Sequence, residues 1–167
     1  PERVPVPRFT ALLDEALKLL DASEFVVVGS GMLALEGLRD VGDLDLLVKP
    51  ETLARLRAQG VSRFLSGGGD YRRDIIETPA GHIDVGDHLM YPITHDPPWD
   101  HLVAARLPTA VVSARRYVQT LAWPDWFAIK TAHGRVKDWN DVVLAARYFA
   151  AKTRSQLPAD GNGVFAA

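Results

Sequence analysis

The stretch Phe-Val-Val-Val-Gly-Ser-Gly at residues 25–31, followed by Asp-Leu-Asp-Leu-Leu-Val at residues 43–48, decides the fold of this chain. The first stretch is short and β-branched, which predicts a buried strand that ends in a glycine turn. Residues 32–38 have room for about two helical turns. The second stretch alternates carboxylate with leucine and then becomes apolar, which predicts a strand whose entering end carries acids.

The flanking segments predict helices on both sides of this unit and a hairpin between them. Apolar residues recur at helical spacing over 8–20, and a second helix is expected over 51–59, with Pro50 at its start. The further expected elements are a strand over 60–65, a loop over 66–70, a hairpin over 71–78 and 82–85, a long loop over 86–101, a strand over 110–112, a helix from Ser113 to about Leu121, and helices over 123–133 and 137–151. We therefore expect an α/β (α+β) fold, a small mixed sheet flanked by helices. We also expect one domain over 1–167, with its core at about 24–112 and C-terminal helices at about 113–151.

Composition narrows the class of protein. The chain has 167 residues, of which 47% are hydrophobic, and this suits one packed domain. Its 19 basic and 21 acidic residues nearly balance, so overall charge does not predict nucleic-acid binding. The absence of cysteine excludes thiolate metal sites and a cysteine nucleophile. No apolar run approaches a membrane span, and residues 1–7 contain no signal core, so we expect a cytoplasmic protein that does not enter a membrane.

Three carboxylates form a candidate metal site. Asp43 and Asp45 are two residues apart, and residues at this spacing on a strand share a face. Asp84 lies on a predicted neighbouring strand. Adjacent carboxylates repel one another unless a cation lies between them, and Mg²⁺ prefers such oxygen ligands. For Asp43 and Asp45 the alternative is a pair of solvated acids at a loop–strand junction.

The glycine turn is a candidate phosphate site. Gly29 and Ser30 follow a buried strand and precede a helix, so their backbone N–H groups can approach phosphate closely. The Ser30 hydroxyl supplies a further donor.

At this point the residues resemble the nucleotidyltransferase superfamily, which has the polymerase-beta-like fold. The signature of that family is an apolar strand, Gly-Gly or Gly-Ser, a helix, Asp-x-Asp or Asp-x-Glu, and a later third acid. Gly29-Ser30, Asp43-x-Asp45 and Asp84 fill these places. Small stand-alone bacterial members carry an Arg four residues before the first acid and a Thr or Ser two before it. Arg39 matches this pattern, whereas Val41 departs from it and removes a hydroxyl contact.

The C-terminal half resembles the helical segment of AbiEii-type toxin nucleotidyltransferases. That segment carries a Lys, an Arg five residues later, and then Asp-x-x-Asp. Lys130, Arg135, Asp138 and Asp141 fill these places, so the resemblance spans about residues 24–148. On a helix, the two acids have the alternative of pairing with nearby basic residues, namely Arg135, Lys137 or Arg147.

The resemblance implies transfer of a nucleoside monophosphate from an NTP such as ATP to an acceptor hydroxyl, with release of pyrophosphate. Asp43 and Asp45 would hold two Mg²⁺ ions. Asp84 would hold the ion at the acceptor hydroxyl and could take its proton.

The same resemblance implies a nucleotide-binding set. Gly29 and Ser30 would bind the β- and γ-phosphates. Lys130, together with Arg39 or Arg135, would neutralise phosphate charge. The alternative for Lys130 and Arg135 is a solvated basic helix face. The acceptor is not specified and is a small molecule, an RNA or a protein. A homodimer or a partner protein would complete the cleft.

Three other interpretations are open. Gly29 to Ala34 fits the G-x-G-x-x-A pattern of a dinucleotide-binding domain, although the acids then lie at the wrong end of the second strand. A histidine metal site would use residues between His82 and His95, namely His82, Asp84, Asp87, His88 and His95. The third interpretation keeps the nucleotidyltransferase fold without catalysis, as an antitoxin or binding module.

Overall fold

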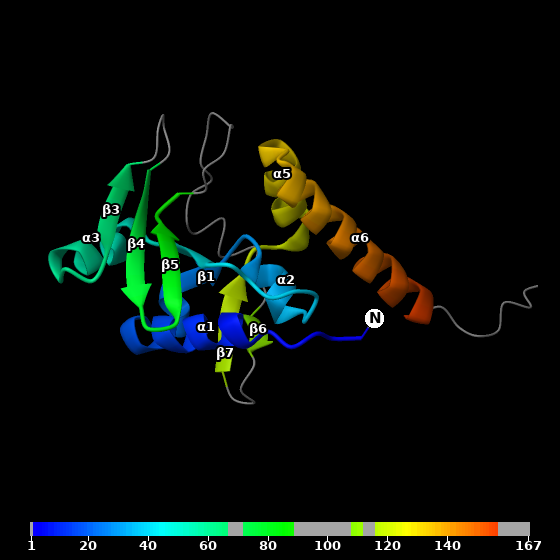
Figure 1. Cartoon of the computed structure of the whole chain (residues 1–167), viewed down its shortest axis with the longest axis horizontal. Coiled ribbons are helices and arrows are strands. Elements are labelled where there is room, and N and C mark those ends of the chain that lie inside the picture. The colour runs from blue at the N-terminus through cyan, green and yellow to red at the C-terminus, as the bar shows by residue number, and fades with distance from the viewer. Residues whose placement is uncertain (1, 67–71, 89–107, 112–115, 157–167) are drawn as a thin grey trace, which may run out of the picture.

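The computed structural model describes residues 2–66, 72–88, 108–111 and 116–156 (Figure 1). These residues form a seven-stranded mixed sheet with the order β3-β4-β5-β2-β1-β7-β6. The strands are β1 (Phe25–Val27), β2 (Leu44–Val48), β3 (Arg63–Ser66), β4 (Arg72–Thr78), β5 (Gly81–Gly86), β6 (Pro108–Val111) and β7 (Arg116–Thr120). Two strand pairs, β2 with β5 and β1 with β7, are parallel, and the others are antiparallel. The predicted fold class is confirmed.

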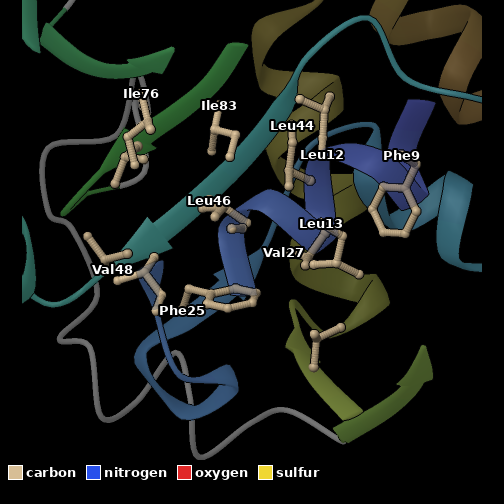
Figure 2. Close-up of a cluster of buried hydrophobic side chains, with 14 of the residues drawn as sticks. Phe9, Leu12, Leu13, Phe25, Val27, Leu44, Leu46, Val48, Ile76 and Ile83 are labelled. Carbon is tan, nitrogen blue, oxygen red and sulfur yellow. The ribbon is translucent and has the colours of Figure 1, made fainter. Parts of the chain in front are cut away.

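Helices pack on both faces of the sheet. The helices are α1 (Pro7–Leu19), α2 (Gly31–Leu35), α3 (Pro50–Ala58), α5 (Trp123–His133) and α6 (Val136–Gln156), and a 3-10 turn, η1, covers Ala22–Glu24. Side chains alternate along a strand, so neighbouring residues of β1 enter different cores. Val27 packs with α1 and α3, and Figure 2 shows this cluster. Val26 packs on the other face with Trp126 of α5 and Ala145 of α6.

Helix α1 shows how sequence pattern becomes packing. Its buried residues, Phe9, Leu12, Leu13 and Ala16, recur at the spacing of one helical face. Its first turn is held from a distance, because the backbone N–H groups of Arg8 and Phe9 each donate to the carboxylate of Asp40 at 2.9 Å. This acid satisfies amides that no residue within the helix can pair.

Most of the predicted elements are present with small shifts at their ends. The helix expected over 32–38 is shorter, because Gly37 adopts φ +70° and closes α2. The N–H of Gly37 donates to Ala34 and that of Leu38 donates to Leu33, each at 2.9 Å, which is the Schellman arrangement. Most of the loops expected over 66–70 and 86–101 lie outside the described residues, and Ser66 is the last residue of β3.

The helix predicted from Ser113 to Leu121 is wrong. Residues 116–120 form β7, which pairs in parallel with β1 through Val26–Gln119 and Val27–Thr120. Val118 is 1% exposed and joins the core shared with Val27. A five-residue segment of mixed propensity takes the state that its neighbours offer, and here the neighbour is an unpaired strand edge. The C-terminal helices therefore begin at Trp123. In the described part of the chain, no helix has the length and apolarity that crossing a membrane requires.

Candidate functional site

Asp45 and Asp84 are brought together by the pairing of β2 and β5. They are register partners on these parallel strands. Their neighbours Leu44, Leu46 and Ile83 belong to the core on the α1 face. Both acids therefore lie on the opposite face, the one on which Trp126 and Ala145 pack. Asp43 is exposed just before β2 and belongs to the same alternation as Asp45.

The acids are crowded enough to affect one another's ionisation. Burial, then the charges of Asp43 and Asp84, raises the pKa of Asp45 to about 7. The charges of Lys130 and Lys137 act in the opposite direction on Asp45 without cancelling the effect. Burial also raises the pKa of Asp84. Repulsion among these carboxylates is therefore incompletely compensated within the described protein.

Arg73 is the partner of Asp84. Its guanidinium donates to the Oδ2 atom of Asp84, which is 9% exposed, and the charge of Arg73 lowers the pKa of that acid against the effect of burial. Among the described residues, no three histidine, aspartate or glutamate side chains form a group that could hold a metal ion. Asp43, Asp45 and Asp84 share a region of the sheet, but they are not gathered around one point.

The turn at Gly29 lies against the carboxylate of Asp45. Gly29 has φ +59°, a left-handed conformation that disfavours any side chain. A Cβ atom built on Gly29 would lie 2.5 Å from Oδ2 of Asp45. The backbone N–H of Val28 donates to the carbonyl oxygen of Asp45 at 3.1 Å, which holds the two segments together. Ser30 precedes α2, and its side chain makes no hydrogen bond that caps this helix.

The three predicted phosphate cations are each bonded to acids of α6. Lys130 is 7% exposed, and its Nζ atom donates to Oδ1 of Asp138 at 3.1 Å and to Oδ2 of Asp141 at 2.9 Å. Arg39 donates to both carboxylate oxygens of Asp141, at 2.7 and 2.9 Å. Arg135 donates from Nε to Oδ2 of Asp138 at 2.6 Å. We call these five residues the buried charge network after its buried members, Lys130, Asp138 and Asp141; the side chains of Arg39 and Arg135 are partly exposed.

The network determines the ionisation of its acids. Burial acts to raise the pKa of Asp138, but hydrogen bonds from Arg135 and Lys130 outweigh it and lower this pKa to about 2. The pKa of Asp141 is also lowered against the effect of burial, by hydrogen bonds from Arg39 and Lys130. Of the pairings open from sequence, the structure shows Asp138 with Arg135. It adds three that the sequence reasoning missed, Lys130 with each of the two acids and Arg39 with Asp141.

The structure identifies two further residues that sequence reasoning missed. Arg73 lies two residues before Ile75, the register partner of Asp84, so the Arg73–Asp84 contact is diagonal across β4 and β5. Trp126 donates its indole N–H to the carbonyl oxygen of Gly29 at 2.8 Å. The spacing of the aromatic residues in α5 predicts packing, and it carries no signal for this hydrogen bond.

The dinucleotide-binding interpretation is wrong for these strands. A dinucleotide-binding unit needs two parallel strands joined by a crossover helix. Here β1 and β2 are antiparallel, and α2 between them has five residues.

The histidine site gains no support from the described residues. His88 pairs with Asp87 at 2.8 Å, between Nδ1 and Oδ1. His82 is exposed on β5, and His95 lies outside the described residues. A cavity of about 620 Å³ near these residues is lined by α3 and the strands β3 to β5, including Arg57, Phe64, Arg73, Gly86 and His88.

Comparisons with known proteins support the fold. No protein-family model matches the sequence, and no curated protein matches it. Among solved structures, the chain is similar to a Thermotoga maritima protein described as a "putative nucleotidyltransferase". The TM-score is 0.58 at 17% sequence identity, and the match covers 87% of this chain and 97% of the other. The chain therefore shares its fold with that protein over most of both lengths.

Proposed function

We propose that this protein is a metal-dependent nucleotidyltransferase that transfers a nucleoside monophosphate from an NTP to an acceptor hydroxyl and releases pyrophosphate. The observation that carries the proposal is the pairing of Asp45 with Asp84 on parallel strands, with the backbone of Gly29 lying against the carboxylate of Asp45. Three carboxylates and a closely approaching backbone supply donors for cations and for phosphate in one region. The fold shared with the Thermotoga protein supports the same class.

The chemistry of the donor set fits a hard divalent ion. Asp43, Asp45 and Asp84 offer only oxygen ligands, and the raised pKa of Asp45 reports negative charge that a cation would relieve. We propose that Asp43 and Asp45 hold Mg²⁺, two ions in the complete site, and that Asp84 joins them once Arg73 releases it. Bound Mg²⁺ supplies charge neutralisation at the phosphates and lowers the pKa of a hydroxyl that it contacts.

The other residues of the proposed site bind the phosphates and accept the proton of the acceptor. The Gly29 turn and Ser30 bind the β- and γ-phosphates, and Lys130 contributes positive charge near Asp45. Arg39 and Arg135 reach phosphate only by sharing their guanidinium groups with the acids of α6. The acceptor oxygen forms a bond to the α-phosphorus while the bond from that atom to the bridging oxygen breaks. Pyrophosphate leaves with the electron pair, and Asp84 takes the proton of the acceptor.

The resemblance to AbiEii-type toxins suggests a finer assignment within this class. We propose a cytoplasmic protein in a toxin–antitoxin context, with a small molecule, RNA or protein as acceptor and with a second copy or a partner protein completing the cleft. The Lys130–Asp141 segment carries this assignment.

A non-catalytic module of the same fold is the second candidate. Two observations favour it: Asp84 is bonded to Arg73, and no three His, Asp or Glu side chains form a metal-holding group among the described residues. Such a module would bind a nucleotide or a partner without catalysing nucleotidyl transfer.

The two candidates are separated by transfer of label. The protein is incubated with each of the four NTPs, labelled at the α-phosphate or at the γ-phosphate, with Mg²⁺ and with total RNA or cell lysate. The first candidate requires transfer of α-label and not γ-label, and loss of transfer in the Asp43→Asn, Asp45→Asn double variant. Glu51→Gln, which changes an exposed acid of α3, is the matched control.

The outcomes have distinct meanings. Unaltered transfer in the double variant contradicts the proposed catalytic acids. Nucleotide binding by calorimetry without transfer to any acceptor supports the non-catalytic candidate.

A further inference from the structure

Trp126 connects the C-terminal helices to the glycine turn of the proposed site. Its indole N–H donates to the carbonyl oxygen of Gly29 at 2.8 Å, across 97 residues of sequence. Trp126 is 1% exposed, so water does not compete for its indole N–H, whereas the Gly29 residue is partly exposed. The carbonyl of Gly29 also accepts from the N–H of Met32, at the longer distance of 3.4 Å. The indole is therefore the stronger of the two partners.

This hydrogen bond determines the orientation of a peptide group. The C=O of Gly29 and the N–H of Ser30 belong to one planar trans peptide, and they point in opposite directions. When the carbonyl points to Trp126, the Ser30 N–H points away from α5. Gly29 has no Cβ atom, so this turn, at φ +59°, lacks the steric restriction that a side chain would impose. Trp126 supplies a restriction from outside the turn.

The position of Trp126 is itself fixed by the buried charge network. Lys130 lies one turn later in α5, with its Nζ atom 5.8 Å from the centre of the Trp126 ring. Asp138 and Asp141 of α6 hold that Nζ atom. A continuous set of contacts therefore runs from α6 through Lys130 and Trp126 to Gly29, whose backbone lies against the carboxylate of Asp45.

We propose that Trp126 is a positioning residue, which holds the Gly29–Ser30 peptide so that the Ser30 N–H is available to the NTP phosphates. The inference rests on the proposed function for its ligand, but the hydrogen bond and its effect on the peptide can be measured without nucleotide. Trp126 itself does not contact the nucleotide.

The test removes one hydrogen and keeps the shape of the ring. Site-specific replacement of Trp126 by 3-benzothienylalanine exchanges the indole N–H for sulfur, which cannot donate. The matched control is the same replacement at Trp123, whose ring packs edge-on against Trp126 with 5.1 Å between ring centres. Three quantities are measured: the Ser30 amide signal in a ¹H–¹⁵N spectrum, the dissociation constant for NTP with Mg²⁺, and the melting temperature.

The proposal expects the Ser30 amide signal to move and broaden in the variant at 126 and not in the variant at 123. It also expects NTP to bind about tenfold more weakly in the variant at 126, as for the loss of one buried hydrogen bond. A lower melting temperature with unchanged Ser30 signal and unchanged NTP binding would show a packing role alone and overturn the proposal.

Failure of the proposed function gives a different result. If the unmodified protein binds no NTP, the nucleotide part of the proposal is overturned along with the proposed function. The Ser30 signal then decides the peptide orientation separately. A shift at 126 supports it, and an unchanged spectrum overturns it.

Discussion

Asp45 and Asp84 lie side by side as register partners on two parallel strands, β2 and β5. Each is flanked by residues of the core on the α1 face, so both carboxylates are directed to the face on which α5 and α6 pack. Placing two acids there works against the stability of the fold, because burial raises the pKa values of both, and so does the charge of Asp43; the charge of Asp84 adds to the effect on Asp45. An arrangement that is unfavourable for folding, with carboxyl pKa values shifted by burial and by neighbouring charges, is typical of a functional site.

The first prediction concerns pH and the stability of the metal-free protein. The pKa of Asp45 is raised from 3.8 to about 7. Below pH 4 this carboxyl is protonated in both folded and unfolded chains, so it does not lower the free energy of unfolding. Between pH 4 and pH 7 the unfolded chain loses the proton first, so stability falls as pH rises. The full cost above pH 7 is at most about 4 kcal/mol. Asp45→Asn should remove this cost.

Urea unfolding in the presence of a chelator, at pH 5, 6, 7 and 8, measures the effect. Wild-type protein should lose stability across this range, and Asp45→Asn should lose less and exceed the wild type at pH 8. Asp43→Asn should give a smaller change in the same direction, because it removes one of the two repelling charges. Parallel curves for wild type and Asp45→Asn would contradict the assigned cause.

A second prediction follows from the contact of Arg73 with Asp84. The guanidinium occupies one carboxylate oxygen and places positive charge beside the proposed metal ligands. Arg73→Gln should therefore tighten binding of Mg²⁺ or Mn²⁺ severalfold, since the Arg73 side chain is 34% exposed and a solvent-screened charge of this kind is worth up to about 1 kcal/mol. Calorimetry with Mg²⁺ and the spin resonance of Mn²⁺ measure the affinity.

Arg63→Gln is the control for this change. Arg63 pairs with Glu77 on the neighbouring strands β3 and β4, and both side chains are 63% exposed, so removal of that cation should leave metal affinity almost unchanged. Weaker metal binding in Arg73→Gln would show instead that Arg73 orients Asp84 for the metal.

The third prediction concerns the buried charge network. Asp138 is fully buried and accepts hydrogen bonds from Lys130 and Arg135. Asp138→Asn therefore removes the negative charge that these two cations share. Breaking a buried pair costs about 3–5 kcal/mol, and we expect a loss near the lower figure because Asp141 still holds Lys130. Urea unfolding at pH 7 measures it, with Glu51→Gln as the exposed control.

The same network predicts how the stability of the protein changes at low pH. The pKa of Asp138 is lowered to about 2, so its contribution is fully present above its ordinary pKa of 3.8 and is lost as pH falls toward 2. Wild-type protein should therefore lose stability between pH 4 and pH 2 more steeply than Asp138→Asn. An equal slope in both proteins would assign the acid sensitivity to other carboxylates.

Local patterns in the sequence were sufficient for most elements and for the acids themselves. The apolar run at 25–28 and the acid–leucine alternation at 43–48 specify strands because each buries its own side chains. The register that pairs Asp45 with Asp84 depends on which strands become neighbours, and no local pattern carries that information. The same holds for β7, whose residues 116–120 become a strand because β1 offers an edge to pair with.

Long-range polar contacts account for what was missed in the candidate site. Arg39 meets Asp141 across 102 residues, and Trp126 meets Gly29 across 97. A motif places Arg39 and Lys130 near phosphate, whereas the structure shows each bonded to an acid of α6. Charge pairing of this kind is decided by the packing of α5 and α6 against the sheet, which spacing along the chain does not specify.

The last prediction tests the turn that lies against Asp45. In Gly29→Ala the new Cβ atom meets Oδ2 of Asp45 at 2.5 Å, in a backbone conformation with φ +59°. The left-handed conformation alone costs about 1–2 kcal/mol, and the contact must displace Asp45 or the turn. Gly29→Ala should therefore lower stability by at least that amount and weaken Mg²⁺ binding. Gly42→Ala is the matched control, because a Cβ atom there meets nothing within 4 Å. Unfolding and calorimetry on both variants decide the matter: if Gly29→Ala loses stability but binds Mg²⁺ as tightly as Gly42→Ala does, the turn supports the fold without shaping the proposed metal site.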